Sequence, residues 1–68
     1  MYVTLHLVDG RKITKDMDRL TFFAPSIMAQ FQNMPPVNDG YITVNLESVV
    51  DMRPAEEDEI EHAKIHGW

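Results

Sequence analysis

The sequence predicts a small α+β domain, and three patterns in the chain support this fold class. Val3–Leu7 and Ile42–Leu46 alternate apolar and polar residues, the period of two that is typical of a half-buried β-strand. Asp-Gly pairs at residues 9–10 and 39–40 mark turns next to these strands. A run of acidic residues follows Pro54, a residue that suits the start of a helix. We therefore expect a small antiparallel β-sheet, or a partly open barrel, of roughly three to four strands, with a short central helix and an acidic C-terminal helix.

The chain of 68 residues is long enough for one domain only. A chain of this length buries about 60% of its unfolded surface, so its stability margin is small. It contains no cysteine, so neither disulfides nor thiolate-bound zinc can reinforce the core. We expect residues 1–54 to form the β-rich part of the domain and residues 55–68 to form an acidic helical tail, docked on it or loosely attached.

The composition does not indicate a membrane protein. No stretch approaches the roughly 20 apolar residues that span a bilayer. The N-terminus also lacks the basic and apolar regions of a secretory signal. We therefore expect a cytoplasmic protein that does not enter a membrane.

The turn of the first hairpin can be chosen from the hydrophobic pattern. A two-residue loop at residues 9–10 would leave Ile13 on the polar face of the hairpin. A three-residue loop at residues 8–10, with Gly10 in the left-handed conformation, pairs Leu5 with Ile13 instead. A shift of one residue turns every side chain to the other face, so only the second register places Ile13 with the leucines. We predict this bulged turn.

The middle of the chain carries its heaviest apolar load. Four apolar residues there recur at helical spacing: Ile27, Met28, Phe31 and Met34. Pro25 fits a first helical position, so we predict a short helix from Pro25 to Asn33 that ends at the two prolines of residues 35–36. An extended conformation for Leu20–Phe23 fits almost as well.

The later strands complete the predicted core. We expect a third strand at Ile42–Leu46 and a fourth at Val49–Met52, with pairing that stops near Arg53 because Pro54 cannot continue a central strand. No internal repeat is evident from the sequence. The predicted core consists of the apolar residues of these elements: Val3, Leu5, Leu7, Ile13, Leu20, Phe22, Ile27, Met28, Phe31, Ile42, Val44, Leu46, Val50 and Met52.

The opening hairpin, Val3–Ile13, resembles the first hairpin of small SH3-like and Sm-like barrel proteins, and residues 42–52 resemble later strands of such a barrel. The resemblance implies a fold and not an activity, because the second motif and the RNA-binding residues of Sm proteins have no counterpart here. Four basic residues form a modest local patch: Arg11, Lys12, Lys15 and Arg19. Against a net charge of −5 we expect nucleic-acid binding to be weak at most.

Charge is distributed unevenly along the chain. Residues 39–68 carry eight carboxylates and two basic side chains, whereas residues 1–38 carry three acids and four bases. Such a tail suits a partner protein with a basic surface. The alternatives are a solvating face and acids that complement the dipole of their own helix. The expected partner-binding residues are the acids of the tail and the terminal tryptophan: Glu56, Glu57, Asp58, Glu59, Glu61 and Trp68.

Two histidines of the tail, His62 and His66, are four residues apart and would face the same side of a helix. Imidazoles at this spacing can bind zinc, copper or nickel, and Glu59 or Asp58 could add a third ligand. The alternative is an exposed tail in which His62 pairs with Asp58 and His66 caps the helix end. No cofactor is indicated.

Enzymatic chemistry finds no support in the sequence. No serine has the context of a nucleophile elbow, and no glycine-rich loop could hold a phosphate. The leading hypothesis is a non-enzymatic protein-interaction module. By analogy with the small acidic proteins of bacteria and their phages, it would be an accessory or inhibitory protein. The alternative is a homo-oligomeric structural subunit that pairs through an open sheet edge or its Phe and Met side chains.

Overall fold

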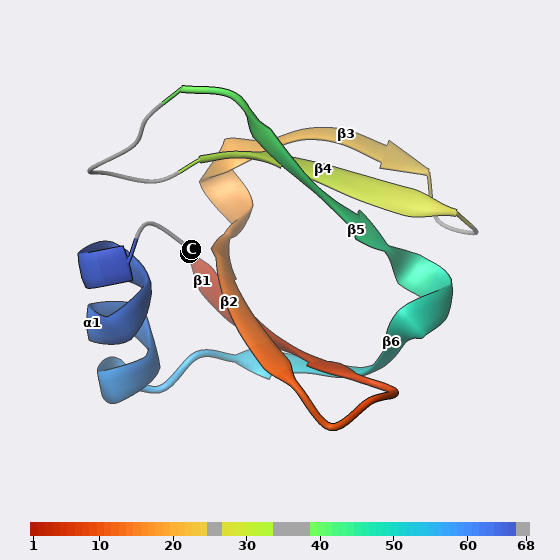
Figure 1. The fold of residues 1–68 in the computed structure, drawn as a ribbon. Helices are drawn as coiled ribbons and strands as arrows, with labels where there is room; N and C mark the ends of the chain where they lie inside the picture. Colours follow the sequence, from red (N-terminus) through yellow and green to blue (C-terminus); the bar gives the residue numbers. More distant parts are fainter. Residues whose placement is uncertain (25–26, 34–38, 67–68) are drawn as a thin grey trace.

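The computed structural model describes residues 1–24, 27–33 and 39–66. Two antiparallel sheets of three strands each face one another, and one helix lies outside them (Figure 1). The first sheet has the strand order β2-β1-β6, with β1 at Tyr2–Leu7, β2 at Lys12–Asp16 and β6 at Val49–Pro54. The second has the order β3-β4-β5, with β3 at Leu20–Ala24, β4 at Met28–Gln32 and β5 at Tyr41–Asn45. The helix, α1, spans Glu57–His66.

This architecture confirms the α+β class and the C-terminal helix. The two sheets do not join into a closed barrel in the part of the chain that the structure describes, because β2, β6, β3 and β5 all remain edge strands. No helix among the described residues has the length and apolar character needed to cross a bilayer.

The first hairpin adopts the predicted bulged turn. Leu5 pairs with Ile13, and Gly10 has a φ of 90°, in the left-handed region that glycine tolerates best. The Leu7 N–H donates to the Arg11 carbonyl at 2.8 Å, which closes the three-residue loop. The hydrophobic pattern therefore predicted the register of β1 and β2 correctly.

The predicted central helix is wrong over Met28–Gln32, which form strand β4 between β3 and β5; Pro25 and Ser26 lie outside the described residues. Within β4, Ala29 and Phe31 are buried, whereas Gln30 donates to Thr43 Oγ1 on the outer face. This alternation competes with the helical spacing in the sequence. Pairing with β3 on one side and with β5 on the other favours the strand over the helix. The extended conformation that was the alternative for Leu20–Phe23 is confirmed, because these residues belong to β3.

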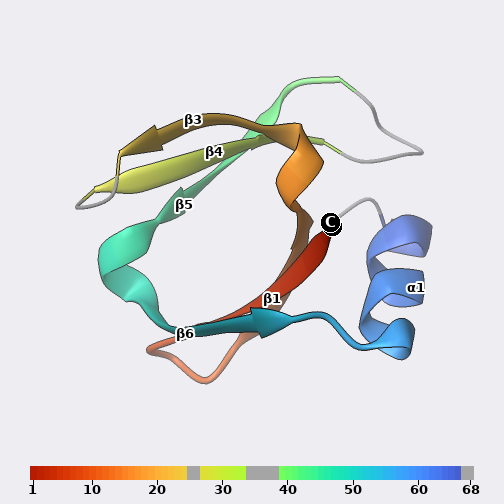
Figure 2. The same cartoon turned by 180° about the vertical axis from the view of Figure 1, so that it is seen from behind.

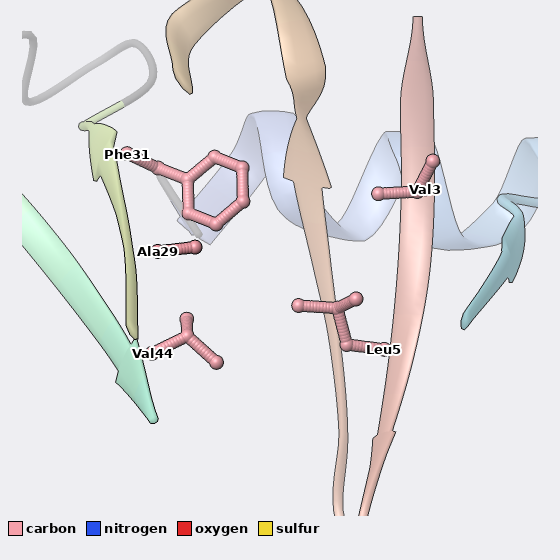
Figure 3. Close-up of a cluster of buried hydrophobic side chains, with 5 residues drawn as sticks. All are labelled: Val3, Leu5, Ala29, Phe31 and Val44. Carbon is pink, nitrogen blue, oxygen red and sulfur yellow. The ribbon is translucent and has the colours of Figure 1, made fainter. Parts of the chain in front are cut away.

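The core lies between the two sheets. Figure 3 shows Val3 and Leu5 of β1 pointing across the interior toward Ala29 and Phe31 of β4 and Val44 of β5. Further apolar side chains are partly buried around this cluster: Ile13, Met17, Leu20, Ile42, Leu46 and Val49. Four predicted core residues are instead exposed, namely Phe22, Ile27, Val50 and Met52. Phe22 lies beside Gln30 on the outer face, and Val50 is the extra residue of a bulge.

The two halves of the chain contain an internal repeat, contrary to the expectation from the sequence. Residues 13–20 read ITKDMDRL and residues 42–49 read ITVNLESV. Each segment is the end of a strand followed by a single 3₁₀ turn and the start of another strand. Asp16 and Asn45 cap the two turns in the same way, because each side chain accepts the backbone N–H two residues later, at 3.0 and 2.9 Å.

The repeat extends to the hairpin that precedes each turn. The Met17 N–H donates to the carbonyl of Met1, just before β1, and the Leu46 N–H donates to the carbonyl of Ile27, just before β4. The strand that leaves each turn then joins the other sheet: β3 pairs with β4, and β6 pairs with β1. Each sheet therefore combines the hairpin of one half with the third strand of the other half.

Candidate functional site

The acidic helix α1 lies against the outside of the β2-β1-β6 sheet (Figure 2). It begins three residues after Pro54, with acids in its first turn and Lys64 and His66 in its last, as its dipole favours. Two of its residues are buried against the sheet, Glu59 and Ala63. Helix α1 therefore packs against the sheet through these two side chains.

Glu59 fastens the helix to the sheet. Its Oε1 accepts hydrogen bonds from Thr4 Oγ1 at 3.0 Å and from Arg53 Nη1 at 2.9 Å. Its Oε2 accepts from Arg53 Nη2 at 2.8 Å and pairs with Lys12 Nζ at 2.9 Å. The Glu56 N–H also donates to Oε1 at 2.8 Å, as in a capping box. The Arg53 guanidinium above all, and then this N–H, hold the pKa of Glu59 well below its ordinary value.

The residues around Glu59 form a buried polar layer between the helix and the sheet. Thr4 and Thr14 lie opposite each other on β1 and β2, and their hydroxyls hydrogen-bond at 3.0 Å. Arg53 Nε–H donates to His6 Nε2 at 3.1 Å. These polar groups are engaged with one another, so the layer anchors α1 to the sheet. The sequence did not indicate the roles of Thr4, His6 and Arg53.

The other acids of the helix region project into solvent: Glu56, Glu57, Asp58 and Glu61. Among the described residues, none of their carboxylates takes part in a hydrogen bond or an ion pair. Three of the five predicted partner-binding acids, Glu57, Asp58 and Glu61, are thus exposed on α1. Glu56 is exposed just before the helix, and Glu59 is internal. The predicted role of Trp68 lies outside the described residues.

The predicted metal ligands, His62 and His66, lie side by side on α1 with ring centroids 4.3 Å apart. Glu59, a candidate third ligand, is committed to Arg53 and Lys12. In residues 1–24, 27–33 and 39–66, no group of three or more histidine, cysteine or acidic side chains is arranged to hold a metal ion. Metal binding by this pair remains a prediction.

Three of the four basic residues that could have formed a patch are engaged with a neighbouring group, and the fourth is buried. Lys12 pairs with Glu59, and Arg11 Nε–H donates to Asp9 at 2.7 Å. Arg19 donates to the carbonyl of Asn33 at 2.8 Å, and Lys15 is buried.

Comparison with protein-family models, with curated proteins and with solved structures finds no match.

Proposed function

We propose that this chain is a non-enzymatic protein-interaction module that meets a basic partner surface through the exposed acids of α1. The observation that supports this is the contrast between Glu59 and its neighbours. Glu59 is buried and ion-paired, whereas Glu56, Glu57 and Glu61 are exposed and form no ion pair with another described residue. A helix already fixed to the sheet presents its charges without an ordering cost at the moment of binding.

Electrostatics then sets the behaviour of the complex. The chain has a formal net charge of −5, and exposed carboxylates on one helix attract a basic surface over about one Debye length, which is roughly 8 Å at physiological ionic strength. Such charges act mainly on the rate of association and on the choice of partner. Binding should therefore weaken strongly as salt is added.

The test is a pull-down from cells that encode the protein, with two variants of equal charge. The first variant neutralises exposed acids of the helix region: Glu56→Gln, Glu57→Gln and Glu61→Gln. The second neutralises three exposed acids elsewhere: Asp39→Asn, Glu47→Gln and Asp51→Asn. Both lose three negative charges, so a difference between them reports position and not net charge. Glu59 is left unchanged because it holds the helix.

The expected result is a partner that the wild type and the second variant retain and the first variant loses. Raising the salt concentration should release the same partner from the wild type. Equal binding by the two variants, or retention at high salt, would contradict an electrostatic contact through α1.

Self-association is a second candidate, favoured by the seam between β3 and β6. Phe23 and Met52 point toward the interior but remain 55% exposed each. They line a cavity of about 130 Å³ whose walls are entirely apolar. Another copy of the chain could cover this opening, as exposed apolar patches often require.

Light scattering over a range of concentrations tests self-association. Phe23→Thr should lower the dimer fraction, whereas Phe22→Thr, on the outer face of the same strand, should leave it unchanged. A protein that stays monomeric at high concentration would exclude this second candidate.

A further inference from the structure

A second cavity lies on the opposite side of the molecule, at the seam between the edge strands β2 and β5, which face the viewer in Figure 1. Its volume is about 400 Å³, within the range of small-molecule sites. Leu7, Ile13, Ile42 and Val44 form its apolar wall. Its titratable lining residues are Arg11 and Lys15, and no acidic residue lines it among those that the structure describes.

Lys15 is the unusual member of this lining. It is only 3% exposed and lies opposite Val3 on the inner face of the first sheet. Within the described residues, its ammonium group has no hydrogen-bond or ion-pair partner. Burial lowers its pKa to about 8, because leaving water disfavours the charged form.

The ammonium group nevertheless reaches solvent. Among the described residues, no side-chain nitrogen or oxygen is fully buried without a hydrogen-bond partner. Lys15 Nζ therefore retains some exposure, and Lys15 is itself one of the residues that line the cavity.

The internal repeat provides a comparison for Lys15, because the other half of the chain has an apolar residue at the equivalent position. Lys15 and Val44 occupy the same position in ITKDMDRL and ITVNLESV, each paired with a buried residue of the neighbouring strand. Val44 is part of the core cluster. An apolar side chain thus satisfies this position in one half, whereas the lysine in the other half has to be desolvated without a partner. A costly buried charge beside a cavity is typical of a binding function.

The charge balance of the cavity defines the class of ligand. Asp9 Oδ2 already accepts a hydrogen bond from Arg11 Nε, which offsets much of the guanidinium charge. The remaining uncompensated charge is close to that of one ammonium group. A single negative charge with an apolar body would satisfy Lys15 and cover Leu7, Ile13 and Ile42 at the same time. A dianion such as phosphate would lack a second free cation.

We propose that this cavity binds an organic monocarboxylate whose carboxylate contacts Lys15 Nζ and whose apolar body lies against the wall between β2 and β5. Two sources supply this chemistry, a free aliphatic acid and the C-terminal carboxylate of a peptide that ends in an apolar residue. The proposal does not depend on the interaction through α1.

The experiment is a titration of the full chain, followed by amide NMR, with octanoate as the probe and octanol and inorganic phosphate as controls. Octanoate should shift resonances of β2 and β5, and Lys15→Val should weaken its binding by at least about tenfold. Val44 shows that valine fits this position, so this variant should fold, and Lys15→Met is a second replacement without charge. An acetylated dipeptide ending in leucine, compared with its C-terminal amide, identifies a peptide source if only the acid form binds.

Three results would overturn the proposal. The first is the absence of shifts up to about 10 mM octanoate, a concentration at which even a weak site is occupied. The second is equal binding of octanoate to the wild type and to Lys15→Val. The third is binding of octanol or phosphate as tight as that of octanoate.

A proton signature gives an independent readout. A bound carboxylate favours the ammonium form, so the pKa of Lys15 should rise from about 8 on binding. Binding at a pH somewhat above 8 should therefore take up protons, measurable by calorimetry in buffers of different ionisation enthalpy. Proton uptake that persists in Lys15→Val would contradict the assignment.

Discussion

Arg53 at the end of β6 forms a two-pronged ion pair with Glu59 in the first turn of α1, with Nη1 to Oε1 at 2.9 Å and Nη2 to Oε2 at 2.8 Å. A planar guanidinium and a carboxylate match in this geometry, which fixes orientation as well as distance. The pair thus determines how the helix sits on the sheet. It also divides the acidic run into one structural residue and several exposed ones.

Glu59→Gln should destabilise the protein by about 2 kcal/mol, between the values of exposed and fully buried ion pairs, because Arg53 remains partly solvated. The amide keeps the shape of the carboxylate but leaves the charge of Arg53 without its partner. Urea unfolding, monitored by circular dichroism, measures the change. Glu57→Gln is the matched control in the same turn and should change stability by less than about 0.5 kcal/mol. Equal effects of the two substitutions would show that Glu59 is not an anchor.

Stability should fall in acid through Glu59. Its pKa is lowered in the folded protein from an ordinary value of 4.5, so the unfolded chain binds the proton first. The stabilisation is complete above about pH 4.5 and is lost as the pH falls toward the folded pKa. Thermal unfolding from pH 7 to pH 2 should therefore show a steeper decline for the wild type than for Glu59→Gln. Parallel curves would contradict this prediction.

The fold was predictable from the sequence where the signals are local. The first hairpin follows from the alternation of Val3–Leu7 and the Asp-Gly turn, and both lie within a few residues. Strand β4 was missed because a short apolar segment fits a helix and a strand equally well. Its pairing with β3 and β5 decides the outcome, and a local pattern does not contain that information.

The candidate sites, too, were predictable from the sequence only where the signal is local. The exposure of Glu56, Glu57 and Glu61 follows from their place in an acidic run. The burial of Glu59 depends on Thr4, which lies 55 residues away in the chain. Lys15 stands in the polar segment KITKD, which suggests a solvent-facing residue. Only its pairing with Val3 reveals that it lies on the inner face.

The two caps of the internal repeat should contribute similarly to stability. Asn45→Ala and Asp16→Ala each remove a side-chain acceptor for the N–H two residues later, and each should cost about 1 kcal/mol. Denaturant unfolding of the two variants and of Asp39→Ala, an exposed control, measures this. Asp16 also lies 3.5 Å from the N-terminal ammonium, so its loss should cost slightly more. A negligible loss of stability at both sites would show that the caps do not stabilise the two 3₁₀ turns at which the chain passes from one sheet to the other.

Lys15→Val should make the protein more stable at neutral pH, and the gain should shrink in alkali. The pKa of Lys15 is lowered from 10.5 to about 8 in the folded protein, so at neutral pH folding has to desolvate a charge. Between about pH 8 and 10.5 the unfolded chain binds the proton more tightly, and the stability of the wild type therefore rises with pH through this residue. We expect a difference of about 1–2 kcal/mol at pH 7, after allowance for solvent screening near the cavity.

Urea unfolding of the wild type and of Lys15→Val at pH 7, 8.5 and 10 measures the convergence. Other groups titrate in this range, including the N-terminal ammonium, whose pKa is raised by its hydrogen bond to Asp18. The contribution of the N-terminal ammonium cancels in the difference between the two proteins, because Lys15 contacts neither this ammonium nor its partner Asp18. A stability difference that is constant with pH would show that Lys15 is not desolvated in the fold. Convergence would instead establish the buried, uncompensated ammonium on which recognition of a carboxylate depends.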